Sequence, residues 1–155
     1  MDKEKLEKMK FSTRAVHAGY QKNEHGALAT PIYQTSTFIF DSAEQGGRRF
    51  ALEEGGYIYS RLGNPTNSQV EEKLANLENG EAAVSTASGM GAITSVLWAK
   101  LKAGDHVVAA NTLYGCTFAF INHGLTRFEV EVDFVDTTDP ENVRKAMKPN
   151  TNVVY

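Results

Sequence analysis

The sequence predicts an α/β fold, with a parallel-rich sheet and helices on both of its faces. From Asn64 onward, short apolar runs alternate with segments of helical periodicity, a pattern typical of parallel strands joined by crossover helices. Glycine or proline stands at most of the junctions between these segments. The 155 residues are 41% hydrophobic and 23% charged, which is the composition of an ordinary folded domain.

The first 63 residues predict an extended N-terminal arm. The Lys- and Glu-rich run at residues 3–10 favours a short, solvated helix, and a second helix is expected over residues 42–53, where Gly46-Gly47 weakens the pattern. Between them lies a long irregular tract that ends near Phe40. Such tracts are uncommon within a compact domain and often bind another subunit. We therefore expect residues 1–63 to contact a neighbouring subunit.

Residues 64–155 carry the regular elements, and each has its own local signal. Asn64 followed by Pro65 is an N-cap with proline in the first turn, and apolar residues at helical spacing continue to Gly80. The further elements expected are a strand over 82–87, a helix over 89–102, a strand over 107–110, a helix over 117–123, a strand over 130–135, a helix from 139 to 149, and a strand that begins at 152.

The last strand begins only four residues before the end of the sequence. An apolar parallel strand that lacks its crossover helix leaves an open edge and half-covered faces. We therefore expect the chain to be part of a longer protein that continues beyond Tyr155.

Charge and cysteine content narrow the function classes. The net charge of -3 gives no basic face for nucleic acid, so small-molecule chemistry is favoured. The single cysteine, Cys116, cannot form an internal disulfide, and the sequence shows neither a signal peptide nor an apolar run long enough for a membrane span. The expected location is the cytoplasm. The four histidines have no regular spacing and no HExxH or Cys-x-x-Cys is present, so we expect no metal site.

Two short segments could bind a phosphate. Ser88-Gly89-Met90-Gly91 stands where a predicted strand turns into a helix, and free N–H groups at a helix N-terminus favour an anion. The alternative is a tight turn that binds nothing. Tyr59 and Arg61 precede the helix at Asn64, and a guanidinium with a tyrosine hydroxyl can also hold a phosphate. Here the alternative is a solvated arginine beside a packing tyrosine.

A third segment, Asn111–Thr117, follows the carboxyl end of the strand over 107–110. Ligands of open parallel sheets bind outside the carboxyl ends of the strands, so this loop is expected to share a crevice with the Ser88 turn. Tyr114 could stack on a flat ring and transfer a proton, and Cys116 could line the pocket. Alternatively, Tyr114 is a half-buried aromatic and Cys116 a small buried apolar residue.

Several stretches together resemble the Cys/Met-metabolism family of pyridoxal-phosphate enzymes. The resemblance runs from about Arg14 to Tyr155. It implies the fold of type I pyridoxal-phosphate-dependent transferases, pyridoxal 5'-phosphate as cofactor, an amino-acid substrate, and a homotetramer of two dimers. Residues 64–155 would then be the first part of the cofactor-binding domain. The stretches that carry the resemblance are Tyr57–Arg61, Gly63–Thr66, Ala87–Ala92, Gly104–Val107 and Asn111–Gly115, with His17–Gly19 and Pro31–Tyr33 also fitting the arm.

The resemblance implies a division of the phosphate contacts between two subunits. Tyr59 and Arg61 would reach the cofactor phosphate of the neighbouring subunit. Ser88, Gly89 and Met90 would hold the phosphate in their own subunit. The resemblance thus favours a phosphate-binding role for both segments.

The resemblance also implies the chemistry at the cofactor ring. Tyr114 would stack on the ring and act as general acid toward a departing thiolate, and Cys116 would help to select the methionine side chain. A cysteine in this position points to the branch that cleaves L-methionine by α,γ-elimination to methanethiol, ammonia and 2-oxobutanoate. Cystathionine gamma-lyase, cystathionine gamma-synthase and O-acetylhomoserine sulfhydrylase activities stay open as alternatives, and Cys116 argues against them.

One feature of the family is missing. Its Schiff-base lysine stands in a Ser-x-Thr-Lys context that does not occur in these 155 residues, and the context of the acidic partner of the ring nitrogen is missing as well. We therefore expect this N-terminal portion to be inactive in isolation. An alternative of another class is a non-catalytic fragment that acts only as a binding or interface module.

Overall fold

The computed structural model describes residues 5–6 and 8–155, and internal contacts divide the chain into two compact units, Met1–Ser85 and Thr86–Tyr155. The helix expected at residues 3–10 lies partly outside the described residues. The predicted boundary at residue 63, where the irregular tract gives way to regular elements, stays a prediction.

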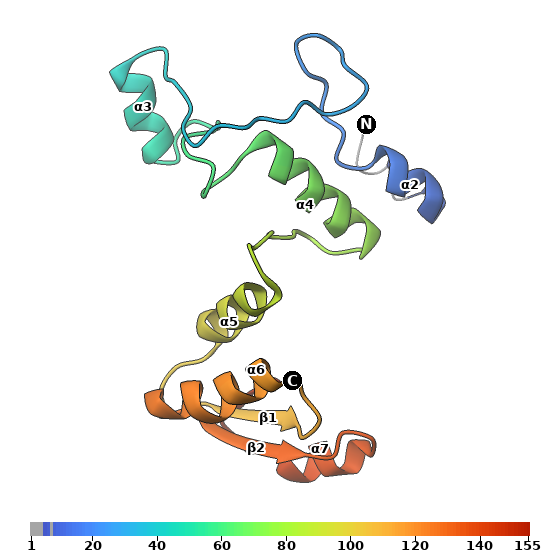
Figure 1. Cartoon of the computed structure of the whole chain (residues 1–155), viewed down its shortest axis with the longest axis vertical. Coiled ribbons are helices and arrows are strands. Elements are labelled where there is room, and N and C mark those ends of the chain that lie inside the picture. Colours follow the sequence, from blue (N-terminus) through green and yellow to red (C-terminus); the bar gives the residue numbers. More distant parts are fainter. Residues whose placement is uncertain (1–4, 7) are drawn as a thin grey trace. The chain divides into compact units, whose positions relative to one another are not determined.

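Helices in the first unit begin where the sequence supplies a cap. Ser42 accepts a hydrogen bond from the Gln45 amide at the start of α3, and Asn64 does the same for Thr66 (2.9 Å) at the start of α4. Both predicted helices are therefore confirmed. A further short helix, α2, was not predicted, because it has no side-chain cap and no buried residue. The helices in question are α2 (Phe11–His17), α3 (Ala43–Phe50) and α4 (Pro65–Leu77) (Figure 1).

The irregular tract of the first unit is fixed mainly by hydrogen bonds. Thr37 and Tyr59 form an isolated antiparallel bridge, and the Ser60 amide donates to the Ser36 carbonyl (2.8 Å). The Asn64 side chain, which is itself buried, donates to the Tyr33 carbonyl (2.9 Å). These contacts hold the segment that carries Tyr59 against the tract that precedes α3.

The second unit contains a parallel sheet, as predicted. Its strand order is β2-β1-β3, and β1 pairs in parallel with both neighbours. Figure 1 shows β1 and β2 side by side and pointing the same way. The elements of this unit are α5 (Gly89–Lys100), β1 (His106–Ala110), α6 (Gly115–Ala119), the π-helical turn η1 (Phe120–Gly124), the 3-10 turn η2 (Leu125–Phe128), β2 (Glu131–Val135), α7 (Pro140–Ala146) and β3 (Thr151–Val154).

Helices cover both faces of this sheet, in agreement with the prediction. The chain moves from β1 to one side at β2 and then back past β1 to β3, so right-handed crossovers place α6 and α7 on opposite faces. Val107 and Ala109 join the main core, and the alternate residues His106 and Val108 are fully buried on the other face. The core consists of Leu97, Leu101, Val107, Ala109, Ile121, Leu125 and Val130.

The prediction of a strand over residues 82–87 was wrong. This segment is extended but irregular, and Val84 is 83% exposed. A strand needs a ladder of hydrogen bonds to a neighbour, and within the described part of the chain the sheet consists of β1, β2 and β3 alone. The apolar run is therefore present without the pairing that would make it a strand.

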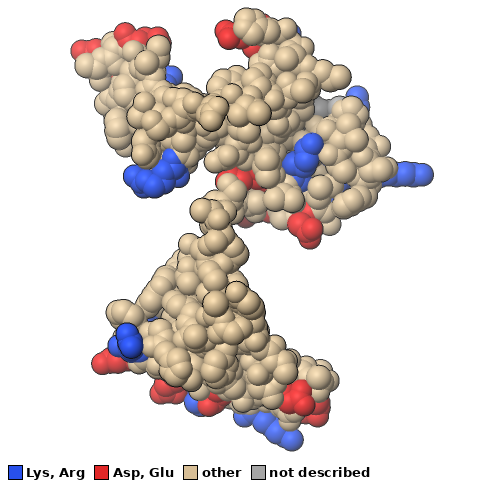
Figure 2. All heavy atoms as spheres, in the orientation of Figure 1, with Lys and Arg blue, Asp and Glu red and all other residues tan. Residues whose placement is uncertain are grey.

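Across residues 5–6 and 8–155, no helix has the length and apolar character needed to cross a membrane. On the face shown in Figure 2, acidic and basic side chains lie in small groups of mixed sign, separated by wide uncharged areas. Several large apolar side chains of the first unit are strongly exposed, among them Leu28, Ile32 and Ile39.

Candidate functional site

Tyr59 and Arg61 lie together in the first unit. The Arg61 guanidinium lies over the Tyr59 ring, 5.5 Å from its centroid, an arrangement typical of cation–π contacts. Among the described residues, no carboxylate forms an ion pair with Arg61. The bridge to Thr37 fixes the backbone of Tyr59. A positive group is thus held in place with its hydrogen-bond donors available to an anion.

An apolar hollow of about 430 Å³ surrounds this pair. Its aromatic wall includes a T-shaped pair, Phe40 and Phe50, with ring centroids 6.2 Å apart. The donors of Arg61 therefore stand beside an apolar surface. The hollow is lined by Thr37, Phe38, Phe40, Phe50, Ile58, Tyr59, Arg61 and Leu62.

The Ser88 turn opens α5 in the second unit. Ser88 Oγ accepts from the Gly91 amide (2.9 Å), which satisfies one first-turn donor and fixes the start of the helix. The amides of Gly89 and Met90 precede the first helical carbonyl that could accept from them. A Cβ at Gly89 would meet nothing within 4 Å, so the side of Gly89 on which a side chain would lie is open. An anion can therefore approach them closely.

Tyr114 and Cys116 stand at the start of α6, after the carboxyl end of β1. Tyr114 is the N-cap residue and is 70% exposed, and the Cys116 thiol is exposed as well. A hydrogen bond with the Cys116 side chain, and then the charge of that group, raise the pKa of the Tyr114 hydroxyl. The phenol therefore carries its proton at neutral pH.

The second unit brings this loop and the Ser88 turn together. Thr117 Oγ1 donates to the Met90 sulfur (3.5 Å), so the first turn of α6 packs on the first turn of α5. Sequence reasoning missed Thr117, although it stands directly after Tyr114-Gly115-Cys116. Its position in a helix that begins at a candidate site was the available signal.

Glu71 is a second residue that sequence reasoning missed. One oxygen of its carboxylate accepts from both the amide and the hydroxyl of Ser85 (2.7 Å each). Ser85 lies three residues before Ser88 along the chain. A glutamate on the face of α4 thereby fixes the segment that leads to the turn.

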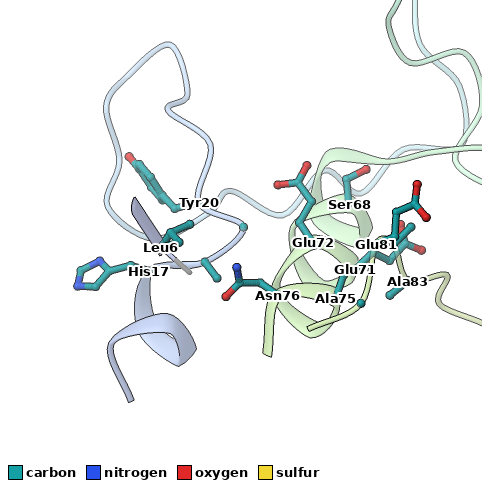
Figure 3. A pocket seen from close by; sticks show the side chains of 14 residues that line it. Leu6, His17, Tyr20, Ser68, Glu71, Glu72, Ala75, Asn76, Glu81 and Ala83 are labelled. Carbon is teal, nitrogen blue, oxygen red and sulfur yellow. The ribbon is translucent and has the colours of Figure 1, made fainter. Parts of the chain in front are cut away.

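A cavity of about 390 Å³ lies within the first unit beside α4 and contains none of the predicted site residues (Figure 3). Two of its acidic side chains already have partners. Glu71 binds Ser85, and Glu72 accepts from Gln21 Nε2 (2.8 Å). The cavity is lined in part by His17, Tyr20, Ser68, Glu71, Glu72 and Asn76.

The buried His106 lies at the amino ends of the strands, opposite to the end that carries Tyr114. It is the first residue of β1, with Nδ1 2.7 Å from Thr151 Oγ1 and Nε2 3.2 Å from Asp133 Oδ2. Its neighbours thus join all three strands at their amino ends. Among the described residues, no group of three or more His, Cys, Asp or Glu side chains could hold a metal ion.

A parallel α/β sheet with a helix start and an exposed Tyr at the carboxyl ends of its strands is the arrangement in which enzymes of this fold class bind phosphate-bearing cofactors. Residues 12–155 match the family model described as Cys/Met metabolism PLP-dependent enzyme. The chain belongs to this family, which confirms the resemblance found in the sequence.

Two curated relatives are similar to this chain over its whole length. The chain is 70% identical over 155 residues to the L-methionine gamma-lyase of Treponema denticola, and it covers 39% of that protein. It is 65% identical over 155 residues to the L-methionine gamma-lyase of Porphyromonas gingivalis, again covering 39%. In both cases the match includes 100% of this chain. The chain thus spans about two fifths of the length of these relatives.

Solved structures confirm the fold. A Campylobacter jejuni structure that contains N'-pyridoxyl-lysine-5'-monophosphate matches with a TM-score of 0.86 and 35% identity, over 94% of this chain and 36% of that one. Cystathionine gamma-lyase from Lactobacillus plantarum, complexed with L-serine, matches with a TM-score of 0.82 and 38% identity, over 95% and 36%. The predicted type I fold of pyridoxal-phosphate enzymes is therefore correct.

Proposed function

We propose that the full-length protein containing this chain is a pyridoxal-phosphate-dependent carbon–sulfur lyase that cleaves L-methionine by α,γ-elimination. The products are methanethiol, ammonia and 2-oxobutanoate. The observation that carries the proposal is the Tyr114–Cys116 pair beside the Ser88 turn, joined through the contact of Thr117 with Met90. The relatives named L-methionine gamma-lyase at 65–70% identity support it.

The Ser88 turn fits the cofactor phosphate. The Gly89 and Met90 amides and the Ser88 N-cap form the start of a 12-residue helix, where the helix dipole stabilises negative charge. Pyridoxal phosphate, when bound, withdraws electrons from the amino-acid substrate. The turn would orient that group by its phosphate, because Ser88 caps the Gly91 amide and leaves the amides of Gly89 and Met90 free.

Tyr114 and Cys116 act on the other part of the ligand. Tyr114 would lie against the flat ring when the cofactor is bound, and its hydroxyl would donate the proton that the leaving thiolate needs. Cys116, exposed beside it, contacts the methionine side chain with a soft, polarizable sulfur.

The arm supplies the remaining contacts across a subunit interface. Residues 1–63 contact the neighbouring subunit, and Tyr59 and Arg61 bind the phosphate of that subunit's cofactor. Strong exposure of Ile32 and Ile39 and the apolar hollow around Arg61 support this role, because such surfaces mark association sites. The full-length assembly is a homotetramer of two dimers, and it acts in the cytoplasm, where a lone thiol stays reduced.

A thiol assay of the full-length enzyme tests the proposal. We expect methanethiol from L-methionine in the presence of pyridoxal phosphate, and no product from the isolated 155-residue chain. Turnover of cystathionine or O-acetylhomoserine without methanethiol would favour the alternatives within the family. Failure to bind the cofactor would favour the non-catalytic module.

Replacing Tyr114 with Phe separates its two roles. The ring is kept and the proton donor is lost, so kcat should fall about 100-fold or more while cofactor affinity changes little. Stopped-flow measurement of elimination gives the rate, and cofactor titration gives the affinity. Equal losses in both would contradict the proton-donor role.

A further inference from the structure

We propose that Thr117 is a positioning residue that fixes Met90, and through it the phosphate-binding turn, against the helix turn that carries Cys116. The inference rests on the proposed function. It concerns how two parts of the site keep their separation, and it names a residue that contacts neither the phosphate nor the ring.

The Thr117 hydroxyl has an unusual partner. Threonine hydroxyls in helices generally donate to a carbonyl in the preceding turn, as Thr126 does to Asn122 (2.8 Å). Thr117 is 1% exposed, yet among the described contacts its hydroxyl donates to the Met90 sulfur at 3.5 Å. Thr117 stands in the first turn of α6, so no helical turn precedes it to offer a carbonyl, and its buried hydroxyl donates to the thioether of α5 instead.

Met90 is held at a second point as well. The Thr94 hydroxyl donates to the Met90 carbonyl (2.8 Å). Methionine is the most flexible apolar side chain, with three rotatable bonds that allow many positions. With one contact at its sulfur and one at its carbonyl, Met90 has little freedom left. Its amide, which no helix carbonyl accepts, is therefore preorganised for an anion.

The other end of the link lies in the reacting part of the site. Thr117 follows Cys116 directly, and the Phe118 amide donates to the Tyr114 carbonyl (3.0 Å) to close the same helical turn. A shift of Thr117 therefore moves this turn as a whole. The contact with Met90 sets the distance between the phosphate amides and the residues that face the ring and the substrate side chain.

Preorganisation has a measurable consequence. A turn that is already ordered loses less conformational entropy when it binds a phosphate. Loss of the hydroxyl should weaken cofactor binding and misplace Tyr114 relative to the ring at the same time, whereas a purely structural role would change stability alone.

The test compares variants of the full-length holoenzyme. Thr117→Val keeps the shape and removes the hydroxyl, Thr117→Ser keeps the hydroxyl, and the control Thr126→Val removes a hydroxyl that donates to the adjoining turn η1. The readouts are the dissociation constant for pyridoxal phosphate, the visible circular dichroism of the bound cofactor, kcat and KM for L-methionine, and thermal unfolding.

We expect Thr117→Val to weaken cofactor binding about 3- to 10-fold, which is the range of one lost hydrogen bond, and to reduce the cofactor dichroism. Thr117→Ser should lie within twofold of the parent, and Thr126→Val should match it. Unchanged affinity and dichroism in Thr117→Val, or equal losses in Thr126→Val, would overturn the inference.

Met90→Leu gives an independent test if Thr117→Val does not fold. It removes the acceptor at similar volume, so it should reproduce the loss of cofactor affinity. A Met90→Leu enzyme with parental affinity and dichroism would refute the link. The parent enzyme separates the two hypotheses: if it binds the cofactor but releases no methanethiol, the proposed reaction fails and the cofactor readouts still decide the role of Thr117.

Discussion

The two units of this chain bury apolar residues in opposite ways. In Thr86–Tyr155, the helices and strands close around a core in which Ile121 is 0% exposed. In Met1–Ser85, Ile39 is 93% exposed, and Leu28 and Leu52 are almost as open. The second unit therefore has its own hydrophobic core, whereas the first unit displays apolar side chains that need a further surface to become buried.

The first unit is ordered mainly by polar contacts to the backbone. The Arg14 guanidinium donates to the carbonyls of Asn76 and Leu77 at the end of α4, and Asn64 binds Tyr33. Hydrogen bonds of this kind fix a shape but contribute less stability than burial of a core. The first unit is thus ordered largely by polar contacts, and many of its large apolar side chains stay exposed.

The largest expected effect tests the comparison directly with a matched pair, Ile121→Ala and Ile39→Ala. In the full-length protein, loss of the buried isoleucine should cost about 2–5 kcal/mol, because it removes apolar contact and leaves a cavity. Loss of the exposed one should change the unfolding free energy by less than about 0.5 kcal/mol and instead weaken subunit association. Urea unfolding and sedimentation measure the two. Equal unfolding costs would show that both units bury their apolar residues in the same way.

Arg61→Ala tests whether the exposed arm reaches a neighbouring site. Loss of charge-assisted hydrogen bonds to a phosphate should weaken pyridoxal phosphate binding about 10- to 100-fold. Arg48→Ala is the control, because Arg48 pairs with Glu54 in the same unit (2.8 Å). Cofactor titration of the full-length apoenzyme measures both variants. Parental affinity in Arg61→Ala would rule out the phosphate role.

Arg14→Ala tests how far polar contacts stabilise the first unit. The guanidinium binds carbonyls at the end of α4, so its loss should destabilise the protein by about 1–2 kcal/mol. Arg127→Ala, an exposed arginine of the second unit, should have little effect. The readout is the urea midpoint of the full-length protein. A midpoint equal to the parent's would mean that α2 is held in another way.

The smallest expected effect is a pH dependence in the second unit. A hydrogen bond from Lys148 lowers the pKa of the Asp133 carboxyl, with a smaller contribution from His106. A lowered folded pKa means stability that is present above the ordinary Asp value and lost as pH falls through the folded pKa. Asp133→Asn should therefore destabilise the protein at pH 7, and its difference from the parent should shrink as pH falls below the ordinary Asp range. Glu78→Gln, on the other unit, is the control. A difference that persists unchanged to pH 3 would contradict the ion pair.

The candidate site shows what could be predicted from neighbouring residues. The helix starts at Asn64 and Ser88 follow from side chains that cap amides two or three positions away, and such contacts are written in consecutive residues. Tyr114 and Cys116 were likewise found from the loop that follows a predicted strand. No role was predicted for the neighbouring Thr117, because its contact is with Met90, 27 positions away.

The sequence by itself determined the α/β class, the parallel direction of the strands and most helix boundaries, since periodicity and caps act within a few residues. Only the tertiary structure decided that residues 82–87 form no strand, that Arg14 secures an unpredicted helix, and that His106 meets Thr151 across 45 positions. The physical reason is that ladder pairing and buried hydrogen bonds need partners from distant parts of the chain, and no local pattern specifies which distant residue will arrive.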